Sequence, residues 1–217
     1  NGEGNGAGAT LNASNLTLVK PGGADGASVT MTAAQNNSFT TATTTGTTDQ
    51  ITLSNAAAAT GLDSIDAYVL AAGAQTFTLG GASQNVTTGT GAVVINTGSV
   101  ANITDAALDG NLADTLKVIV NADTNISAAV ITGINNTQDA DYTIDIATDA
   151  DAITMTIAQN ALIGTVTDGT DAVITLSDAG AATGDAGIST YVLAAGAQTF
   201  TLGSAGQNVT ADSTGAS

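Results

Sequence analysis

The chain has 217 residues, 43% of them hydrophobic, and a formal net charge of −17 from nineteen acidic side chains and two lysines. Such a surface repels nucleic-acid phosphates and lacks the basic patch that attracts anionic lipids, which excludes both as partners. With no histidine and no cysteine, the chain lacks the side chains that most often serve as general acid–base and as thiol nucleophile, so we expect no enzyme.

The N-terminal part of the chain begins with a polar stretch. Residues 1–8 read NGEGNGAG, and the only proline, Pro21, lies in the Gly-rich sequence KPGGADG. We expect residues 1–27 to form a flexible lead-in with a first strand, and residues 28–217 to form one folded array. No run of about eighteen apolar residues occurs in the chain, so no membrane insertion is expected.

Alternation with a period of two is the main local pattern of the array. Apolar residues alternate with Thr or Asp in the segments 51–53, 76–79, 143–146 and 153–157, and residues 117–120 (KVIV) are a short, largely apolar run. This period is typical of strands with one buried and one wet face, and Thr, Val and Ile suit a pleated sheet. Because Gly, Asn, Asp and Ser separate the segments, we predict short strands joined by turns.

One segment carries a conflicting signal. Residues 54–60 read SNAAAAT and contain good helix formers, but a second copy of this segment has Gly180 at the position of Ala57. Glycine costs about 1 kcal/mol in a helix interior, so a helix there would be weakened. We interpret the segment as a turn or small bulge.

The chain contains a long internal repeat. The sequence YVLAAGAQTFTLG occurs at 68–80 and again at 191–203, and residues 51–88 align without gaps on 174–211 with 28 of 38 positions identical. Residues 30–36 match 154–160 after one insertion. The copies span about 30–88 and 154–211, with a period of about 123 and connecting rungs at 89–153. Recurrence at a fixed period is typical of stacked architectures.

These patterns predict an all-β protein, namely a parallel β-solenoid (β-helix) built from short Thr/Ala/Gly/Asp-rich strands. The alternative is a series of tandem β-sandwich repeats. The solenoid is favoured because the period exceeds the roughly 100 residues of one sandwich. The chain also has no tryptophan for a sandwich centre, and only three Phe and three Tyr.

Several segments resemble a known class of bacterial proteins. Residues 114–120 (DTLKVIV), 125–134 (NISAAVITGI) and 190–203 (TYVLAAGAQTFTLG) resemble the strand repeats of bacterial surface-layer proteins and giant RTX-type adhesins. The resemblance extends from about residue 28 onward. It implies an exported structural protein, a β-solenoid fold, type I secretion and stabilisation by calcium. No full copy of the family's calcium-binding nonapeptide GGxGxDxUx occurs, so no ligand is carried over.

Calcium binding is also expected from the residues themselves. Hard cations prefer carboxylate and carbonyl oxygens gathered in turns, and the charge of −17 leaves most carboxylates without a cationic partner. The alternative for each aspartate is a turn cap that bonds its own backbone. The candidate ligands lie in DADYTID and the turns that follow it: Asp139, Asp141, Asp145, Asp149, Asp151, Asp168 and Asp171.

Together, these features predict a non-catalytic structural protein, exported to the bacterial cell surface or extracellular space, that self-assembles into a surface layer or extracellular filament. The expected partner is therefore a second copy, in a homopolymer or lattice. One alternative is a rigid stalk segment of a large calcium-stabilised adhesin. A more remote one is an ice-binding solenoid, suggested by the Thr-rich residues 38–48. Eight Asn-x-Ser/Thr triplets leave a cell-surface glycan open as a further partner.

Overall fold

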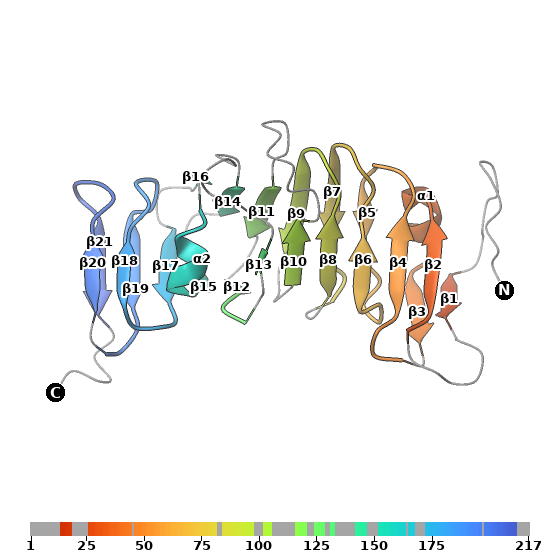
Figure 1. The fold of residues 1–217 in the computed structure, drawn as a ribbon, viewed down its shortest axis with the longest axis horizontal. Helices are drawn as coiled ribbons and strands as arrows, with labels where there is room; N and C mark the ends of the chain where they lie inside the picture. The colour runs from red at the N-terminus through yellow and green to blue at the C-terminus, as the bar shows by residue number, and fades with distance from the viewer. Residues whose placement is uncertain are drawn as a thin grey trace.

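The computed structural model describes residues 14–18, 26–44, 46–81, 84–97, 102–105, 116–120, 124–128, 131–132, 142–146, 152–163, 165–167, 172–196 and 198–211. These residues form short strands and two one-turn helices, coiled into a parallel β-solenoid. Figure 1 shows the strands side by side along the long axis, with β1 toward one end of the rod and β20 and β21 at the other. The predicted fold class is confirmed. Every strand pairing in the described residues is parallel, whereas sandwiches pair their strands antiparallel.

Three long sheets form the walls of the coil. Sheet I contains β2 (Ser28–Met31), β4 (Gln50–Leu53), β6 (Ala67–Val69), β8 (Asn85–Thr88), β10 (Asn102–Asp105) and β13 (Ile131–Thr132). Sheet II contains β5 (Ala59–Thr60), β7 (Gln75–Thr78), β9 (Val93–Thr97), β11 (Leu116–Val120), β14 (Tyr142–Ile146) and β16 (Thr165–Thr167). Sheet III contains β12 (Thr124–Asn125), β15 (Ala152–Met155), β17 (Val173–Leu176), β19 (Thr190–Leu193) and β21 (Asn208–Ala211).

Two smaller sheets lie nearer the two ends of the chain. Sheet IV pairs β18 (Ala181–Thr183) with β20 (Thr199–Thr201), and sheet V pairs β1 (Asn15–Leu18) with β3 (Thr41–Thr44). The helices are α1 (Ala33–Asn36) and α2 (Ile157–Asn160).

Successive coils stack in register around a thin, mostly aliphatic interior. Paired positions are 17 residues apart between β4 and β6, and 18 apart between β6 and β8. Since partners in a parallel sheet point their side chains to the same face, Ile51, Tyr68 and Val86 form one inward column. Each of these three side chains is at most 1% exposed. The alternation of polar and apolar residues therefore creates a narrow core, which is enclosed within the single coil at each level of the stack.

The two repeat copies have the same local fold but occupy different sheets. Strands β4 to β8 alternate between sheets I and II, and their counterparts β17 to β21 alternate between sheets III and IV. Sheet III begins at β12, sheet I ends at β13 and sheet II ends at β16. Each copy therefore builds its own pair of sheets, and the connecting residues 89–153 contain most of the change from one pair to the next.

The helices correct one detail of the strand prediction. Residues 153–157 were expected to continue as a strand, but β15 ends at Met155, Thr156 is an N-cap and Ile157 begins α2. The Thr156 side chain accepts from the Gln159 amide at 3.1 Å, and the Thr156 amide donates to the Gln159 side chain at 2.7 Å. This reciprocal capping box overrides the period-two alternation. The segment 54–60 forms no helix, as expected, but the predicted turn covers only residues 54–58, because Ala59 and Thr60 form β5.

Candidate functional site

Each helix ends in a buried asparagine that closes the adjoining strand. Helix α1 lies against β5, where Asn36 Nδ2 donates to the Thr60 carbonyl at 2.7 Å. In the second copy, α2 lies against β18 and Asn160 Nδ2 donates to the Thr183 carbonyl at 2.8 Å. Asn36 is fully buried. A side-chain amide therefore makes the hydrogen bond that a further strand would otherwise make to β5.

A buried tyrosine connects this asparagine to the opposite wall. Tyr68 Oη donates to Asn36 Oδ1 at 3.2 Å and accepts from the Leu62 amide at 2.8 Å. Burial raises the pKa of Tyr68 to about 12, and the Leu62 amide acts in the opposite direction by favouring the phenolate. The hydroxyl is neutral at physiological pH and fixes the distance between two coils.

The second copy repeats this network. Tyr191 Oη donates to Asn160 Oδ1 at 3.3 Å and accepts from the Asp185 amide at 2.7 Å. Burial raises the pKa of Tyr191 to about 12; the Asp185 amide lowers it and the Asp185 carboxylate raises it. Asp185 occupies the position of Leu62 in the second copy. The hydrogen bond to the tyrosine hydroxyl is kept because its donor is the backbone amide in both copies.

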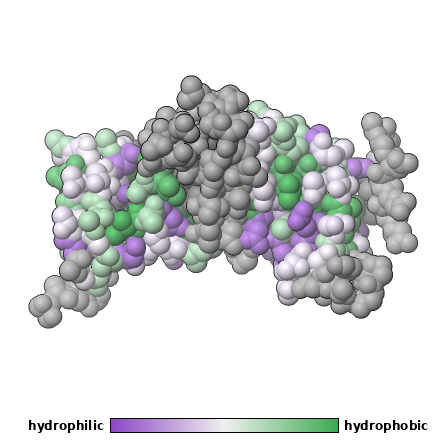
Figure 2. Space-filling view, viewed as in Figure 1, coloured by the Kyte–Doolittle hydropathy of each residue, from purple (hydrophilic) through white to green (hydrophobic). Residues whose placement is uncertain are grey.

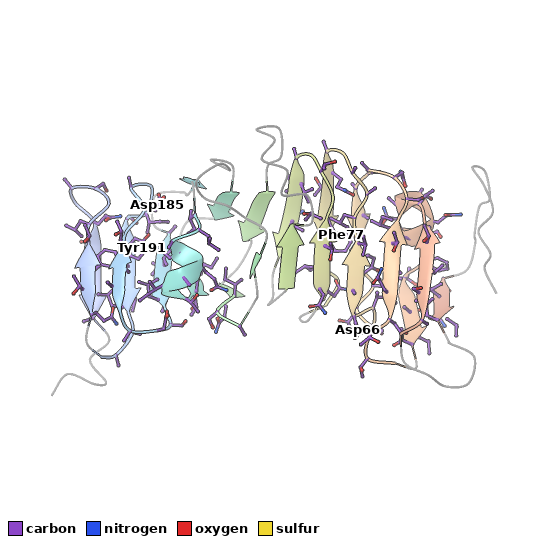
Figure 3. The ribbon with its side chains drawn as sticks, viewed as in Figure 1. Asp66, Phe77, Asp185 and Tyr191 are labelled. Carbon is purple, nitrogen blue, oxygen red and sulfur yellow. The ribbon has the colours of Figure 1, made fainter. Side chains whose placement is uncertain are left out.

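An aromatic pair fills the centre of each copy. The rings of Tyr68 and Phe77 have centroids 4.8 Å apart at 49°, and those of Tyr191 and Phe200 are 4.8 Å apart at 50°. This tilted arrangement suits the ring quadrupoles. Figure 3 shows Phe77 and Tyr191 within the coils of their respective copies. Four of the six aromatic residues of the chain thus form the same pair twice.

A glutamine holds the turn on the far side of each copy. Gln84 Nε2 donates to the carbonyls of Leu62 and Ile65 at 2.7 and 3.1 Å, and its Oε1 accepts from the Gly80 amide at 2.8 Å. Its counterpart Gln207 makes the same three contacts, at 2.5, 2.8 and 2.7 Å. A single side chain thereby satisfies three backbone groups that no strand pairs.

Glycine permits the closest approach of neighbouring coils. A Cβ atom at Gly80 would lie 1.9 Å from the carbonyl oxygen of Gly61, and one at Gly203 would lie 2.0 Å from that of Gly184. No side chain fits there, so this position requires glycine in both copies.

Two aspartates bond the corners of the first coils. Asp49 Oδ1 accepts from the Ala27 amide at 2.7 Å and Oδ2 from the Gly46 amide at 3.2 Å, while the Asp49 amide donates to Asp66 Oδ2 at 2.9 Å. Asp49 is 1% exposed, and Figure 3 shows Asp66 at the rim of the rod. The aligned residues of the second copy are Ala172 and Ser189.

The predicted calcium ligands fall almost entirely outside the described residues. Asp145 lies in β14, where the structure describes the backbone but not the side chain. Within the described part of the chain, no group of three or more His, Cys, Asp or Glu side chains is arranged to hold a metal ion. The remaining candidates lie outside that part: Asp139, Asp141, Asp149, Asp151, Asp168 and Asp171.

Threonines on the outer face of sheet I form one interrupted column. The strand register aligns six positions, five of them threonine: Thr30, Thr52, Val69, Thr87, Thr104 and Thr132. The adjacent outward column contains no threonine among its first four members: Ser28, Gln50, Ala67 and Asn85. Of the Thr-rich residues 38–48, four form β3 and pair with β1.

Comparison with protein-family models, curated proteins and solved structures found no match. In the described residues, no helix is long and apolar enough to span a membrane. The residues that stand out are an asparagine, a tyrosine and a glutamine that occur in both copies. All three bond backbone groups, and the asparagine and tyrosine also bond each other. What this arrangement does chemically is hold successive coils at a fixed spacing.

These residues could have been found from the sequence by comparing the two copies, rather than from the alternation of apolar and polar residues. Gln35, Asn36 and Gln84 are identical in the two copies, although polar surface positions such as Asn55 and Asp66 have changed. Polar identity between diverging copies marks side chains with buried partners. The T-x-x-Q sequence of each copy was likewise a visible capping box.

Proposed function

We propose that this chain is an exported, non-catalytic structural protein that self-assembles into a bacterial surface layer or an extracellular filament. The observation that carries the proposal is the stacking of parallel coils in the described residues, in which each coil presents an edge for the next. A rod of this kind supplies stiffness along its axis because backbone hydrogen bonds run from coil to coil.

The interior supports a mechanical role rather than a chemical one. The buried polar side chains of the described residues bond backbone groups or each other, apart from Gln75 Oε1, which has no partner. Tyr68 is held neutral and fully enclosed, so it is not placed to exchange protons with a substrate. The resemblance to surface-layer and adhesin repeats adds the expectation of export and of a location at the bacterial cell surface.

Electron microscopy of the purified chain tests the proposal. Ordered lattices or fibres are the expected result. Isolated rods at every concentration would instead favour the alternative of an adhesin stalk, whose binding function lies in another domain. Protein that forms neither rods nor assemblies would refute both.

Calcium enters the proposal as a stabilising ion. Bound divalent cations would offset the repulsion among nineteen acidic side chains. We expect the melting temperature to fall when EDTA replaces 1–10 mM calcium, with magnesium as the control for general ionic effects. An unchanged melting temperature would show that calcium does not stabilise the fold. The assembly proposal would still be tested by electron microscopy.

A further inference from the structure

One outward column of side chains reads the same in both repeat copies. In the first copy the strand register stacks it along β2, β4, β6 and β8, and in the second copy along β15, β17, β19 and β21. Both columns run Thr, Thr, Val, Thr, and every member is partly or fully exposed. We call them the threonine columns: Thr30, Thr52, Val69 and Thr87 in the first copy, and Thr154, Thr175, Val192 and Thr210 in the second.

The outward column beside each threonine column has changed between the copies. Substitutions at exposed positions usually alter stability little, so exposed residues diverge readily where only the fold constrains them. The threonine columns are similarly exposed and have not diverged, which indicates a contact outside the folded chain. Three of the four neighbouring positions differ and the last agrees: Ser28, Gln50, Ala67 and Asn85 in the first copy, and Ala152, Val173, Thr190 and Asn208 in the second.

The composition of these columns narrows the class of partner. Neither the threonine columns nor the columns beside them contain a charged or aromatic residue. They therefore offer no counter-charge to an ionic partner and no stacking surface to a sugar ring. A second copy of the chain is disfavoured as well, because each copy carries a charge of −17 and repels the other.

What the columns do offer is a row of methyl groups and hydroxyls. A threonine hydroxyl donates one hydrogen bond and accepts two, so Thr52 keeps capacity for water although it accepts from Gln50 Nε2 at 3.2 Å. Valine has nearly the shape of threonine, so the row keeps its profile at Val69 and Val192. Methyl groups restrict the orientation of the water next to them, and the hydroxyls bind it.

The backbone fixes the spacing of this row. Neighbouring strands lie about 4.8 Å apart, and parallel register places equivalent side chains at that interval. Figure 1 shows β2, β4, β6 and β8 side by side in this way. The interval is close to the repeat of equivalent water oxygens along the a axis of hexagonal ice. Water ordered along a threonine column therefore has a spacing that an ice surface can continue.

We propose that the threonine columns of sheets I and III bind ice. This activity goes beyond the proposed structural function and does not rest on it. A charged group would hold water in its own shell and disturb the ordered layer. Five aspartates of the described residues lie outside the strands, which keeps their charges off the columns: Asp49, Asp63, Asp66, Asp178 and Asp185.

Inhibition of ice recrystallisation and thermal hysteresis, both measured on the whole chain, test the proposal. The test variant is Thr52→Tyr/Thr175→Tyr, which places a bulky ring within each threonine column. The matched control is Thr76→Tyr/Thr199→Tyr, which makes the same change at equivalent positions of β7 and β20. No threonine column lies there, since the column of Thr76 continues with Val94 and Lys117, and Thr199 lies beside Ala181.

Thermal melting first establishes that each variant is folded. A second variant, Thr52→Ser/Thr175→Ser, keeps both hydroxyls and removes one methyl group from each column. It should weaken the activity, and it keeps the test decisive if the tyrosine variant melts at a lower temperature than the unmodified chain.

We expect the unmodified chain to slow recrystallisation and to show a hysteresis gap at concentrations at which serum albumin does neither. The tyrosine variant should lose both activities, and the matched control should keep both. An unmodified chain without either activity overturns the proposal, while self-assembly is still judged by microscopy. Equal activity of the tyrosine variant and the control also overturns it, because the ice contact then lies on another face.

Discussion

Replacement of Asn36 by alanine tests the buried network at its centre. Asn36 is fully buried, donates to the Thr60 carbonyl at 2.7 Å and accepts from the Tyr68 hydroxyl at 3.2 Å. Alanine removes both contacts, and a 3.4 Å bond to Asn37 Oδ1, without adding volume. The Thr60 carbonyl and the Tyr68 hydroxyl each lose the hydrogen bond that Asn36 supplied.

The magnitude follows from these two groups. A buried polar group that loses its partner costs about 1–3 kcal/mol. Because Tyr68 keeps its bond from the Leu62 amide, we expect a combined loss of about 2–4 kcal/mol in the free energy of unfolding. Domains of this size are stable by about 5–15 kcal/mol, so the change is a large part of the total.

Urea unfolding followed by far-UV circular dichroism at 25 °C measures this loss. The control is Asn37→Ala, which removes a neighbouring asparagine whose hydrogen bonds are exposed; its expected cost is about 0.5 kcal/mol. Asn160→Ala should reproduce the larger effect in the second copy, since it makes the same pair of contacts. Equal effects of Asn36→Ala and Asn37→Ala would refute the reasoning.

Three further predictions concern other parts of the interior. The contribution of Tyr68 and Tyr191 to stability should be constant up to pH 10.0 and be lost as the pH rises toward about 12, because the unfolded chain ionises two tyrosines that the folded chain keeps neutral; Tyr68→Phe should remove about half of this loss, and an equal slope in both chains would contradict it. Asp49→Ala should cost about 1–3 kcal/mol in urea unfolding, against about 0.5 kcal/mol or less for the exposed Asp63→Ala. Gly80→Ala should lower the melting temperature by forcing a Cβ to within 1.9 Å of the Gly61 carbonyl oxygen, and an unchanged melting temperature would show that the coils do not approach this closely.

The strands were predictable because their physics is local. Residues 51–53 and 76–79 alternate between apolar and Thr side chains, and β4 and β7 form there to within one residue. A strand with one buried face needs little beyond this period. The stacking of the coils followed from the internal repeat, since identical segments at a fixed spacing bury their faces on neighbouring coils.

The helices and the change of sheets were not predictable from alternation. Ile157 continues the period of β15, and only the reciprocal Thr156–Gln159 bonds turn the chain there. The change from sheets I and II to sheets III and IV depends on which strands pair with one another in the connecting residues. Those pairings join positions such as Ile103 and Ile131, and their choice depends on the whole stack rather than on either segment.

The residues of the buried polar network could be recognised in the sequence as polar identities between the two copies. Motifs for metal binding or catalysis did not point to them. The acidic clusters drew attention because carboxylates bind metals, yet an aspartate that bonds both neighbouring coils is Asp49, which stands alone in TTDQ. Its partner is the amide of Ala27, which is distant in sequence. A contact of this kind becomes recognisable only once the register of the coils is known.

Interstrand backbone NOEs measured by NMR test the central claim, that parallel coils stacked in register hold the molecule together. Parallel stacking in register predicts NOE contacts that join β4 to β6 at a constant separation of 17 residues, and β6 to β8 at a constant separation of 18. Contacts between these strands whose residue numbers instead sum to a constant would show antiparallel hairpins and contradict the solenoid.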